Sequence, residues 1–156
     1  ENYRTFAKLS PPLRTESDRL AIIQGLQDGT IDAIVSDHTP QDQDAKRLPF
    51  NQAEYGAVGL ETLLPLTLSL VKNGSLKIES VLSLVTNKPA DILGLKSGVI
   101  GKGFDADLIV IDENKPWKIE ADNFLSKSKN TPFDDLLVEG KNLMTFIKGR
   151  LVFKCL

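Results

Sequence analysis

A short apolar run in this sequence ends abruptly in an acid and the chain's single histidine. The run from Asp32 to Ser36 is nearly continuously apolar, and Asp37 and His38 follow it before a long polar stretch. Such a run is typical of a strand that is buried on both faces of a parallel sheet. Parallel strands must be joined by a crossover, which is usually a helix. The run therefore predicts an α/β fold.

The residues before this run supply the rest of a βαβ unit. Tyr3 to Leu9 is expected to form a strand that ends before two prolines. A helix follows, for which Thr15 and Asp18 resemble a capping box and Gly29 is the stop signal. Strand, helix and strand in this order predict a βαβ unit whose crossover is the helix.

The sequence changes character near residue 95. Before that point it predicts a polar loop over residues 37–55 and helices over residues 60–72, 76–86 and 89–93. After it, glycines separate β-rich runs at residues 107–112, 136–139 and 143–153, with hairpin turns expected at 140–142 and 148–150. We therefore expect two domains, an α/β domain over residues 1–95 and an all-β domain over residues 96–156.

Composition limits the class of protein. With 41% hydrophobic and 26% charged residues among 156, the chain has an ordinary globular composition. A formal net charge of −2 without a basic run argues against nucleic acid as a partner. The longest apolar stretch, residues 60–71, is too short and interrupted to span a bilayer, so no membrane is expected. The lone Cys155 excludes an internal disulfide and fits a reducing compartment, so a cytoplasmic protein is expected.

Asp37 is the candidate for chemistry that the residues themselves provide. An acid at the carboxyl end of a buried parallel strand lies where barrel enzymes place catalytic groups. The alternative is that Asp37 caps the loop or forms an Asx turn, and that His38 is a hydrogen-bonded structural residue. One histidine and one distant cysteine cannot supply three ligands for catalytic zinc, so this chain cannot build such a site unaided. A serine triad is not supported either, because no Gly-x-Ser-x-Gly motif occurs.

Four ordered motifs resemble the carboxyl-terminal third of dihydroorotases, which belong to the amidohydrolase superfamily. The motifs are SPPLRTESDRLAIIQGL, SDHTPQ, PFNQAEYGAVGLETLLPL and NKPADILGLKSGVIGKGFDADLIVID. The last motif is similar to hydantoinases and allantoinases as well, whereas Asp-His-x-Pro followed by Pro-Phe and Gly-x-Val-Gly-Leu-Glu-Thr is more particular to dihydroorotases. Because the chain also begins without methionine, we expect it to be a piece of a longer protein.

The resemblance implies a fold for each part of the chain. Dihydroorotases are (β/α)8 TIM barrels that carry a small β-sandwich built from both chain ends. On that template, residues 1–95 are the carboxyl-terminal portion of the barrel, with Tyr3 to Leu9 and Ile31 to Ser36 as its last two strands. Residues 96–156 are the carboxyl-terminal part of the β-sandwich.

The resemblance also implies roles for five residues. Asp37 matches the aspartate that ligates the more buried ion of a zinc pair (Zn2+) and acts as the general base. Ser10 and Gln41 stand where asparagine and histidine usually contact the substrate, so neither supplies a positive charge for the substrate carboxylate. Tyr55 and Gly56 match a pair whose backbone grips the pyrimidine ring, although a tight turn explains Gly56 equally well.

The implied activity is hydrolysis of a cyclic amide. A dihydroorotase interconverts dihydroorotate and carbamoyl aspartate in pyrimidine biosynthesis, and a homodimer is expected. This chain lacks the His-x-His-x-Arg strand, the bridging carboxylate and the other zinc histidines, so alone it is expected to bind no metal and to be inactive. The alternatives are a non-catalytic homologue that scaffolds aspartate transcarbamoylase, and a related cyclic amidase of hydantoinase or allantoinase type. Three basic side chains are expected to face solvent, namely Arg14, Lys46 and Arg47.

Overall fold

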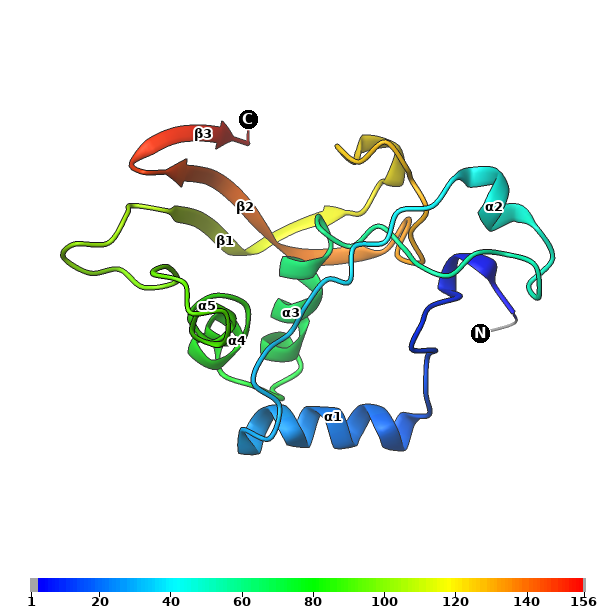
Figure 1. Ribbon diagram of the computed structural model, residues 1–156, viewed down its shortest axis with the longest axis horizontal. Coiled ribbons are helices and arrows are strands. Elements are labelled where there is room, and N and C mark those ends of the chain that lie inside the picture. Colours follow the sequence, from blue (N-terminus) through cyan, green and yellow to red (C-terminus); the bar gives the residue numbers. More distant parts are fainter. Residues whose placement is uncertain (1–2, 156) are drawn as a thin grey trace. The chain divides into compact units, whose positions relative to one another are not determined.

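The computed structural model of the chain describes residues 3–155. All five α-helices among residues 3–155 come before the strands along the chain (Figure 1). In chain order the elements are η1 (Thr5–Ala7), α1 (Glu16–Asp28), α2 (Gln43–Arg47), α3 (Leu63–Lys72), α4 (Ile78–Val85), α5 (Asn87–Ile92), β1 (Leu108–Lys118), η2 (Ala121–Asn123), β2 (Leu137–Ile147) and β3 (Arg150–Lys154), where η marks a 3-10 helix. The α/β class predicted from the sequence is confirmed.

Helix α1 begins and ends at the residues that the sequence marks. The Thr15 N–H donates to Asp18 Oδ2 at 3.0 Å, and the Asp18 N–H donates to Thr15 Oγ1 at 3.3 Å, which is the reciprocal pattern of a capping box. The Thr15 hydroxyl bond to Asp18 is the main cause that lowers the pKa of this carboxyl group. Gly29 follows the helix with a φ of +83°, the left-handed conformation common just beyond a helix end.

The three helices predicted after the polar loop are also present. Helix α3 begins at Leu63, so Pro65 lies in the first turn, where its missing N–H removes no helical hydrogen bond. Helices α4 and α5 pack against each other (Figure 1). The side chains of Leu68, Val81 and Leu84 are at most 1% exposed. The apolar faces of α3 and α4 are therefore buried, as their sequences predict.

Two predicted strands are not formed among residues 3–155. The range Tyr3 to Leu9 contains only the 3-10 helix η1, and Asp32 to Ser36 belongs to no strand. A strand is stable when a neighbouring strand pairs with its backbone groups, and no described strand runs beside either segment. The Ile34 N–H instead donates to Leu84 O at 2.9 Å. The described part of the chain by itself therefore does not form the predicted βαβ unit, although its crossover helix forms.

Strands β1, β2 and β3 form one sheet in that order (Figure 1). β2 pairs antiparallel with β3, and the predicted turn at 148–150 joins them. The turn predicted at 140–142 is wrong, because β2 continues through these residues. Gly140 serves packing instead: its carbonyl accepts a 2.9 Å bond from Trp117 Nε1, and a Cβ there would clash with Leu68 Cδ1. The predicted β-sandwich stays a prediction, since residues 3–155 contain this one sheet layer.

The chain divides into two compact units that are each discontinuous in sequence. The first unit contains residues 1–21, 36–63 and 118–137, and the second contains residues 22–35, 64–117 and 138–156. Buried hydrophobic residues of the first unit are Ala53, Ala57, Val58, Ile119, Ala121 and Phe124, and those of the second are Leu26, Leu68, Val81, Leu84 and Ala90. All five candidate site residues lie in the first unit. The domain division near residue 95 stays a prediction.

No helix among residues 3–155 is long and apolar enough to cross a membrane.

Candidate functional site

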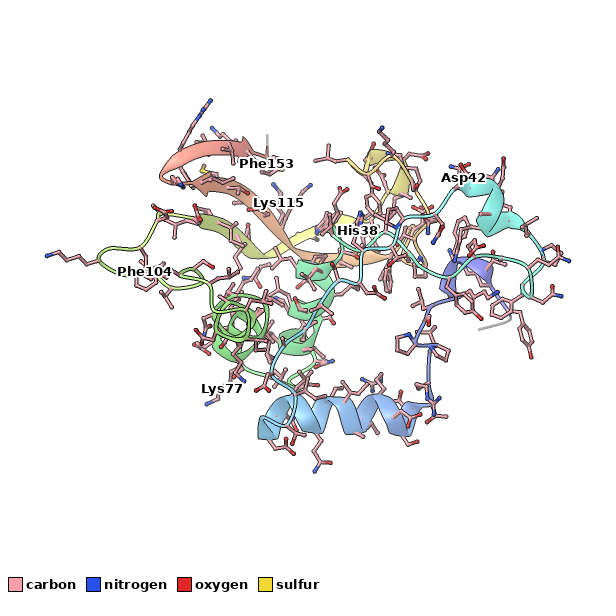
Figure 2. All side chains as sticks on the ribbon, viewed as in Figure 1. His38, Asp42, Lys77, Phe104, Lys115 and Phe153 are labelled. Carbon is pink, nitrogen blue, oxygen red and sulfur yellow. The ribbon has the colours of Figure 1, made fainter. Side chains whose placement is uncertain are left out.

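Two stretches of the polar loop pair at its base. Residues 36–39 and 56–59 lie side by side, because His38 and Ala57 form an isolated parallel bridge. The Thr39 N–H donates to Ala57 O at 2.9 Å within this contact. Figure 2 labels His38 in this region and Asp42 farther along, where the chain enters α2. The pairing closes residues 36–59 into a single loop, which we call the site loop.

Two glycines make this pairing possible. A Cβ atom on Gly56 would lie 2.6 Å from Thr39 O, and one on Gly59 would lie 2.5 Å from Ser36 O. Gly56 also has a φ of +115°, which residues with a side chain rarely adopt. Close backbone approach, together with this conformation, therefore explains the Gly-x-x-Gly spacing at residues 56–59.

Asp37 presents an exposed carboxylate at the start of the site loop. Its φ of +44° lies in the left-handed region, which aspartate tolerates better than most residues. The Thr39 hydroxyl donates to Asp37 Oδ1 at 3.2 Å, and no other group among residues 3–155 donates to this carboxylate. The Thr39 N–H bonds to Ala57 O, so the Asx turn that was the alternative for Asp37 does not form. Asp37 Oδ2 remains open to a cation or a water molecule.

His38 has a structural role, which was the alternative interpretation of this residue. Its Nδ1 accepts a hydrogen bond from the Gly59 N–H at 3.2 Å, which assigns the neutral ring's proton to Nε2. The side chain is half-buried beside the paired backbone segments. The histidine therefore fixes the base of the site loop.

The structure brings together three of the five candidate residues. Gln41 Nε2 donates to Tyr55 O at 2.8 Å, and Gly56 is next in sequence. Asn130 joins the same group from outside the loop: its Oδ1 accepts from the Gln41 N–H at 3.0 Å, and its Nδ2 donates to Gly56 O at 3.2 Å. Gln41, Tyr55 and Gly56 are thus held by one network. Ser10 is exposed and shares no hydrogen bond with the other candidates among residues 3–155.

Replacing Asn130 with alanine is expected to lower the free energy of unfolding by about 1–3 kcal/mol, the usual cost of leaving buried polar partners unpaired. Asn130 is fully buried, and its loss removes the bonded partner of the Gln41 N–H. Asn123→Ala is the matched control, because that side chain is exposed. Thermal denaturation of the full-length protein measures both variants. Equal melting temperatures for the two would contradict the network described here.

Two lysines of the first unit are buried. Lys46 is 0% exposed and Lys8 is 7% exposed. The prediction that Lys46 faces solvent is therefore wrong, whereas Arg14 and Arg47 are exposed as predicted. Burial is the main cause that lowers the pKa of Lys46, and the nearby ammonium of Lys8 acts in the same direction.

Reductive methylation of the folded full-length protein is expected to leave Lys46 unmodified. A buried amine is closed to the reagent, whereas Lys148, whose side chain is 74% exposed, is open to it. Mass spectrometry of proteolytic peptides measures both sites, and denatured protein, in which both amines react, is the control. Modification of Lys46 as fast as in the denatured sample would show that the amine is accessible.

Comparison with known proteins identifies the family. The sequence model of the amidohydrolase family matches residues 8–152, which is most of the chain. The chain belongs to the amidohydrolase family. Curated relatives of this amidohydrolase include proteins named dihydroorotase from Anaplasma phagocytophilum, at 49% identity over 96% of this chain, and from a Wolbachia of Drosophila simulans, at 47% over 98%. The chain spans 34% and 35% of the lengths of these relatives, so it corresponds to about a third of each.

A solved amidohydrolase structure supports the fold. L-hydantoinase (dihydropyrimidinase) from Arthrobacter aurescens superposes on 98% of this chain with a TM-score of 0.92 and 31% sequence identity. The chain covers 35% of that structure. The segments that lack strand partners here therefore have a conformation that matches part of a larger fold.

Members of this family are generally metal-dependent, and the donor set of this chain fits one part of a metal site. Among residues 3–155, no three side chains of the types His, Cys, Asp and Glu come together. Asp37 nevertheless has the chemistry of a ligand, since one carboxylate oxygen is open. A single carboxylate can supply only part of a metal site, so the remaining ligands would have to come from outside residues 3–155.

Three residues of the site were not predicted from the sequence, namely Lys8, Lys46 and Asn130. Asn130 stands in Asn-Thr-Pro, where a polar pair precedes a proline, and such a polar pair is ordinarily exposed. Lys46 lies beside Arg47 in a charged stretch that is typical of a solvated helix. The one signal in the sequence was Lys8, a charged residue within the range Tyr3 to Leu9 that was expected to form a strand.

Proposed function

We propose that the full-length protein is a zinc-dependent dihydroorotase. The observation that carries this proposal is the identity of 45–49% to curated relatives named dihydroorotase, compared with 31% to the structure named L-hydantoinase. The ordered network around Gln41, Tyr55 and Gly56 supports it, because these residues match substrate positions of dihydroorotases. The reaction would interconvert dihydroorotate and carbamoyl aspartate.

The proposed architecture follows from the same match. Residues 1–95 would complete a (β/α)8 barrel, in which residues 3–9 and 31–36 gain strand partners from the rest of the protein. Residues 96–156 would complete a β-sandwich. Asp37 then follows the last barrel strand, at the end of the barrel where active sites of this fold lie.

Asp37 would hold one zinc ion of a pair and serve as the general base. Zinc, when bound, makes hydroxide available near neutral pH and polarises the amide carbonyl. As hydroxide attacks the ring carbonyl carbon, Asp37 accepts its proton. Asp37 then delivers that proton to the ring nitrogen as the C–N bond breaks, which gives the open carbamoyl aspartate. The open oxygen of the Asp37 carboxylate supports this role.

The substrate would be held by neutral groups of the site loop. Gln41 has one amide hydrogen bonded to Tyr55 O, so its second amide hydrogen and Oε1 are available for the substrate. The backbone at Tyr55 and Gly56 would contact the pyrimidine ring edge. Ser10 would contribute a hydroxyl to the same ligand. Because none of these groups is charged, the positive charge for the substrate carboxylate must come from residues outside this set.

Turnover assays with the full-length protein test the function. We expect hydrolysis of dihydroorotate with higher kcat/KM than of hydantoin or allantoin, and loss of activity after zinc is removed by a chelator. The isolated 156-residue chain is the control and is expected to be inactive. Preference for hydantoin would contradict the substrate assignment and support a related cyclic amidase, which the hydantoinase superposition favours.

A scaffolding homologue is the other alternative. Ser10 and Gln41 depart from the residues usual at those positions, which favours loss of catalysis. A full-length protein that binds aspartate transcarbamoylase but hydrolyses no cyclic amide would support this alternative. Size-exclusion chromatography with light scattering tests both the transcarbamoylase partner and the expected homodimer, and cell fractionation tests the expected cytoplasmic location.

A further inference from the structure

We propose that Lys46 is a positioning residue that holds the substrate-binding end of the site loop in place. This inference rests on the proposed function, because the loop carries Gln41, Tyr55 and Gly56. Lys46 lies on α2, within the loop, and its side chain points back to the base of the loop, as its bonds to Gly56 and Lys8 require.

The Lys46 ammonium is bonded only to backbone carbonyls. Its Nζ donates to Glu54 O at 2.8 Å, to Gly56 O at 3.0 Å and to Lys8 O at 3.2 Å. An ammonium has three hydrogens, so these carbonyls satisfy its whole donor capacity. Two of the three acceptors flank Tyr55, and the third lies outside the loop. One side chain therefore joins α2 to both neighbours of Tyr55 and to the preceding chain.

Lys8 reinforces the same attachment from the other side. Its Nζ donates to Ala53 O at 2.6 Å and to Phe50 O at 2.7 Å, and it lies 4.5 Å from the centre of the Tyr55 ring. The Gly56 N–H donates to Lys8 O at 3.0 Å, so Lys8 O accepts from both Gly56 and Lys46. Lys8 and Lys46 together, which we call the lysine clamp, contact the loop over residues 50–56.

The lysine clamp carries charge that no carboxylate of the described residues contacts directly, and the Glu54 carboxylate acts only from a longer distance, where its charge opposes the lowering of the Lys46 pKa. Among residues 3–155, neither ammonium takes part in an ion pair with a carboxylate. Buried charges are costly unless hydrogen bonds satisfy them, so a lysine in this position requires its carbonyl partners to stay in place. The converse also holds: the carbonyls of Glu54 and Gly56 are fixed by the ammonium. The conformation of Tyr55 and Gly56 is thus coupled to Lys46 through charge-assisted bonds, which are stronger than neutral ones.

Methionine and arginine substitutions at position 46 separate positioning from general stability. Lys46→Met keeps the unbranched apolar stem of the side chain, lacks the terminal ammonium and donates no hydrogen bond. Lys46→Arg keeps the charge, but a planar guanidinium cannot direct three hydrogens from one nitrogen to three converging carbonyls. Arg47→Met is the matched control, because Arg47 is the exposed neighbour on the same helix.

Steady-state kinetics and amide hydrogen exchange of the full-length protein provide the test. For Lys46→Met we expect KM for dihydroorotate to rise about tenfold, the change in affinity that accompanies loss of one strong hydrogen bond, with kcat nearly unchanged. Exchange should accelerate in residues 41–56 and not elsewhere. Lys46→Arg should fall between Lys46→Met and wild type, and Arg47→Met should match wild type.

Three outcomes would overturn the inference. The first is a Lys46→Met protein whose KM and exchange match those of Arg47→Met. The second is faster exchange over the whole chain, which would make Lys46 a general stabilising residue; if Lys46→Met does not fold, Lys46→Arg answers the same question. The third is a fall in kcat with KM unchanged. If the wild type hydrolyses no dihydroorotate, the proposed function fails. The rate of hydrogen exchange in residues 41–56 then decides by itself whether Lys46 holds the site loop in place.

Discussion

Asp37→Asn in the full-length protein is expected to lower kcat for dihydroorotate hydrolysis by roughly 10²–10⁴, the usual contribution of a general base. Asparagine keeps the size of the side chain and tolerates the left-handed φ of +44° at this position. The Thr39 hydroxyl that donates to Asp37 Oδ1 can donate to the amide oxygen equally well. If Asp37 has the proposed roles, the substitution removes the general base and a charged metal ligand without disturbing the site loop.

Asp44→Asn is the matched control for this prediction. Asp44 is an exposed acid of α2 in the same loop, so its substitution changes net charge equally. Stopped assays at saturating zinc, with metal content measured for each variant, separate the loss of the base from the loss of metal. A kcat for Asp37→Asn equal to that of Asp44→Asn would exclude Asp37 from the reaction.

Gly56→Ala is expected to lower the free energy of unfolding by about 2–4 kcal/mol, because it adds backbone strain to a steric clash. The φ of +115° is unfavourable for alanine, and the new Cβ would lie 2.6 Å from Thr39 O. Relief of the clash must separate the paired segments, which would also displace the Gly56 carbonyl from Lys46 and Asn130. We therefore expect weaker substrate binding together with a lower melting temperature.

Gly103→Ala measures the cost of the backbone conformation alone, without a steric clash. Gly103 has a φ of +90°, but a Cβ there would meet no atom within 4 Å. Its substitution should cost about 1–2 kcal/mol through conformation alone. Thermal melting of the two full-length variants gives the difference that belongs to the clash. Equal destabilisation by both substitutions would show that residues 36–39 and 56–59 are not tightly paired.

Local sequence signals predicted the helices of this chain and failed for two of its strands. Thr15, Asp18 and Gly29 specify α1 through bonds and dihedral angles within a few residues, so they act wherever the helix lies. Strands depend on partners, and residues 3–9 and 32–36 have no neighbouring strand among the residues described. The turn predicted at Gly140 is wrong for a related reason. A glycine is needed there because the chain packs closely against Leu68, which is distant in sequence.

A candidate residue can be found from the sequence when its own position marks it, but not when it depends on groups that meet only in the fold. Asp37 is marked by its place after an apolar run; its carboxylate is exposed, and its role in the site stays a prediction. Lys46 looks like a solvated lysine, because the carbonyls that bury it meet only after the loop has folded. Gln41 stands where dihydroorotases usually have a histidine. The sequence did not indicate that this glutamine side chain bonds to Tyr55 O within the site loop.

A crystal structure of the full-length protein, with anomalous data collected at the zinc absorption edge, tests the central claim most directly. The account predicts a zinc ion with a carboxylate oxygen of Asp37 about 2.0–2.2 Å away, the usual zinc–carboxylate distance. A zinc ion ligated entirely by other residues, with the Asp37 carboxylate directed to solvent, would contradict it.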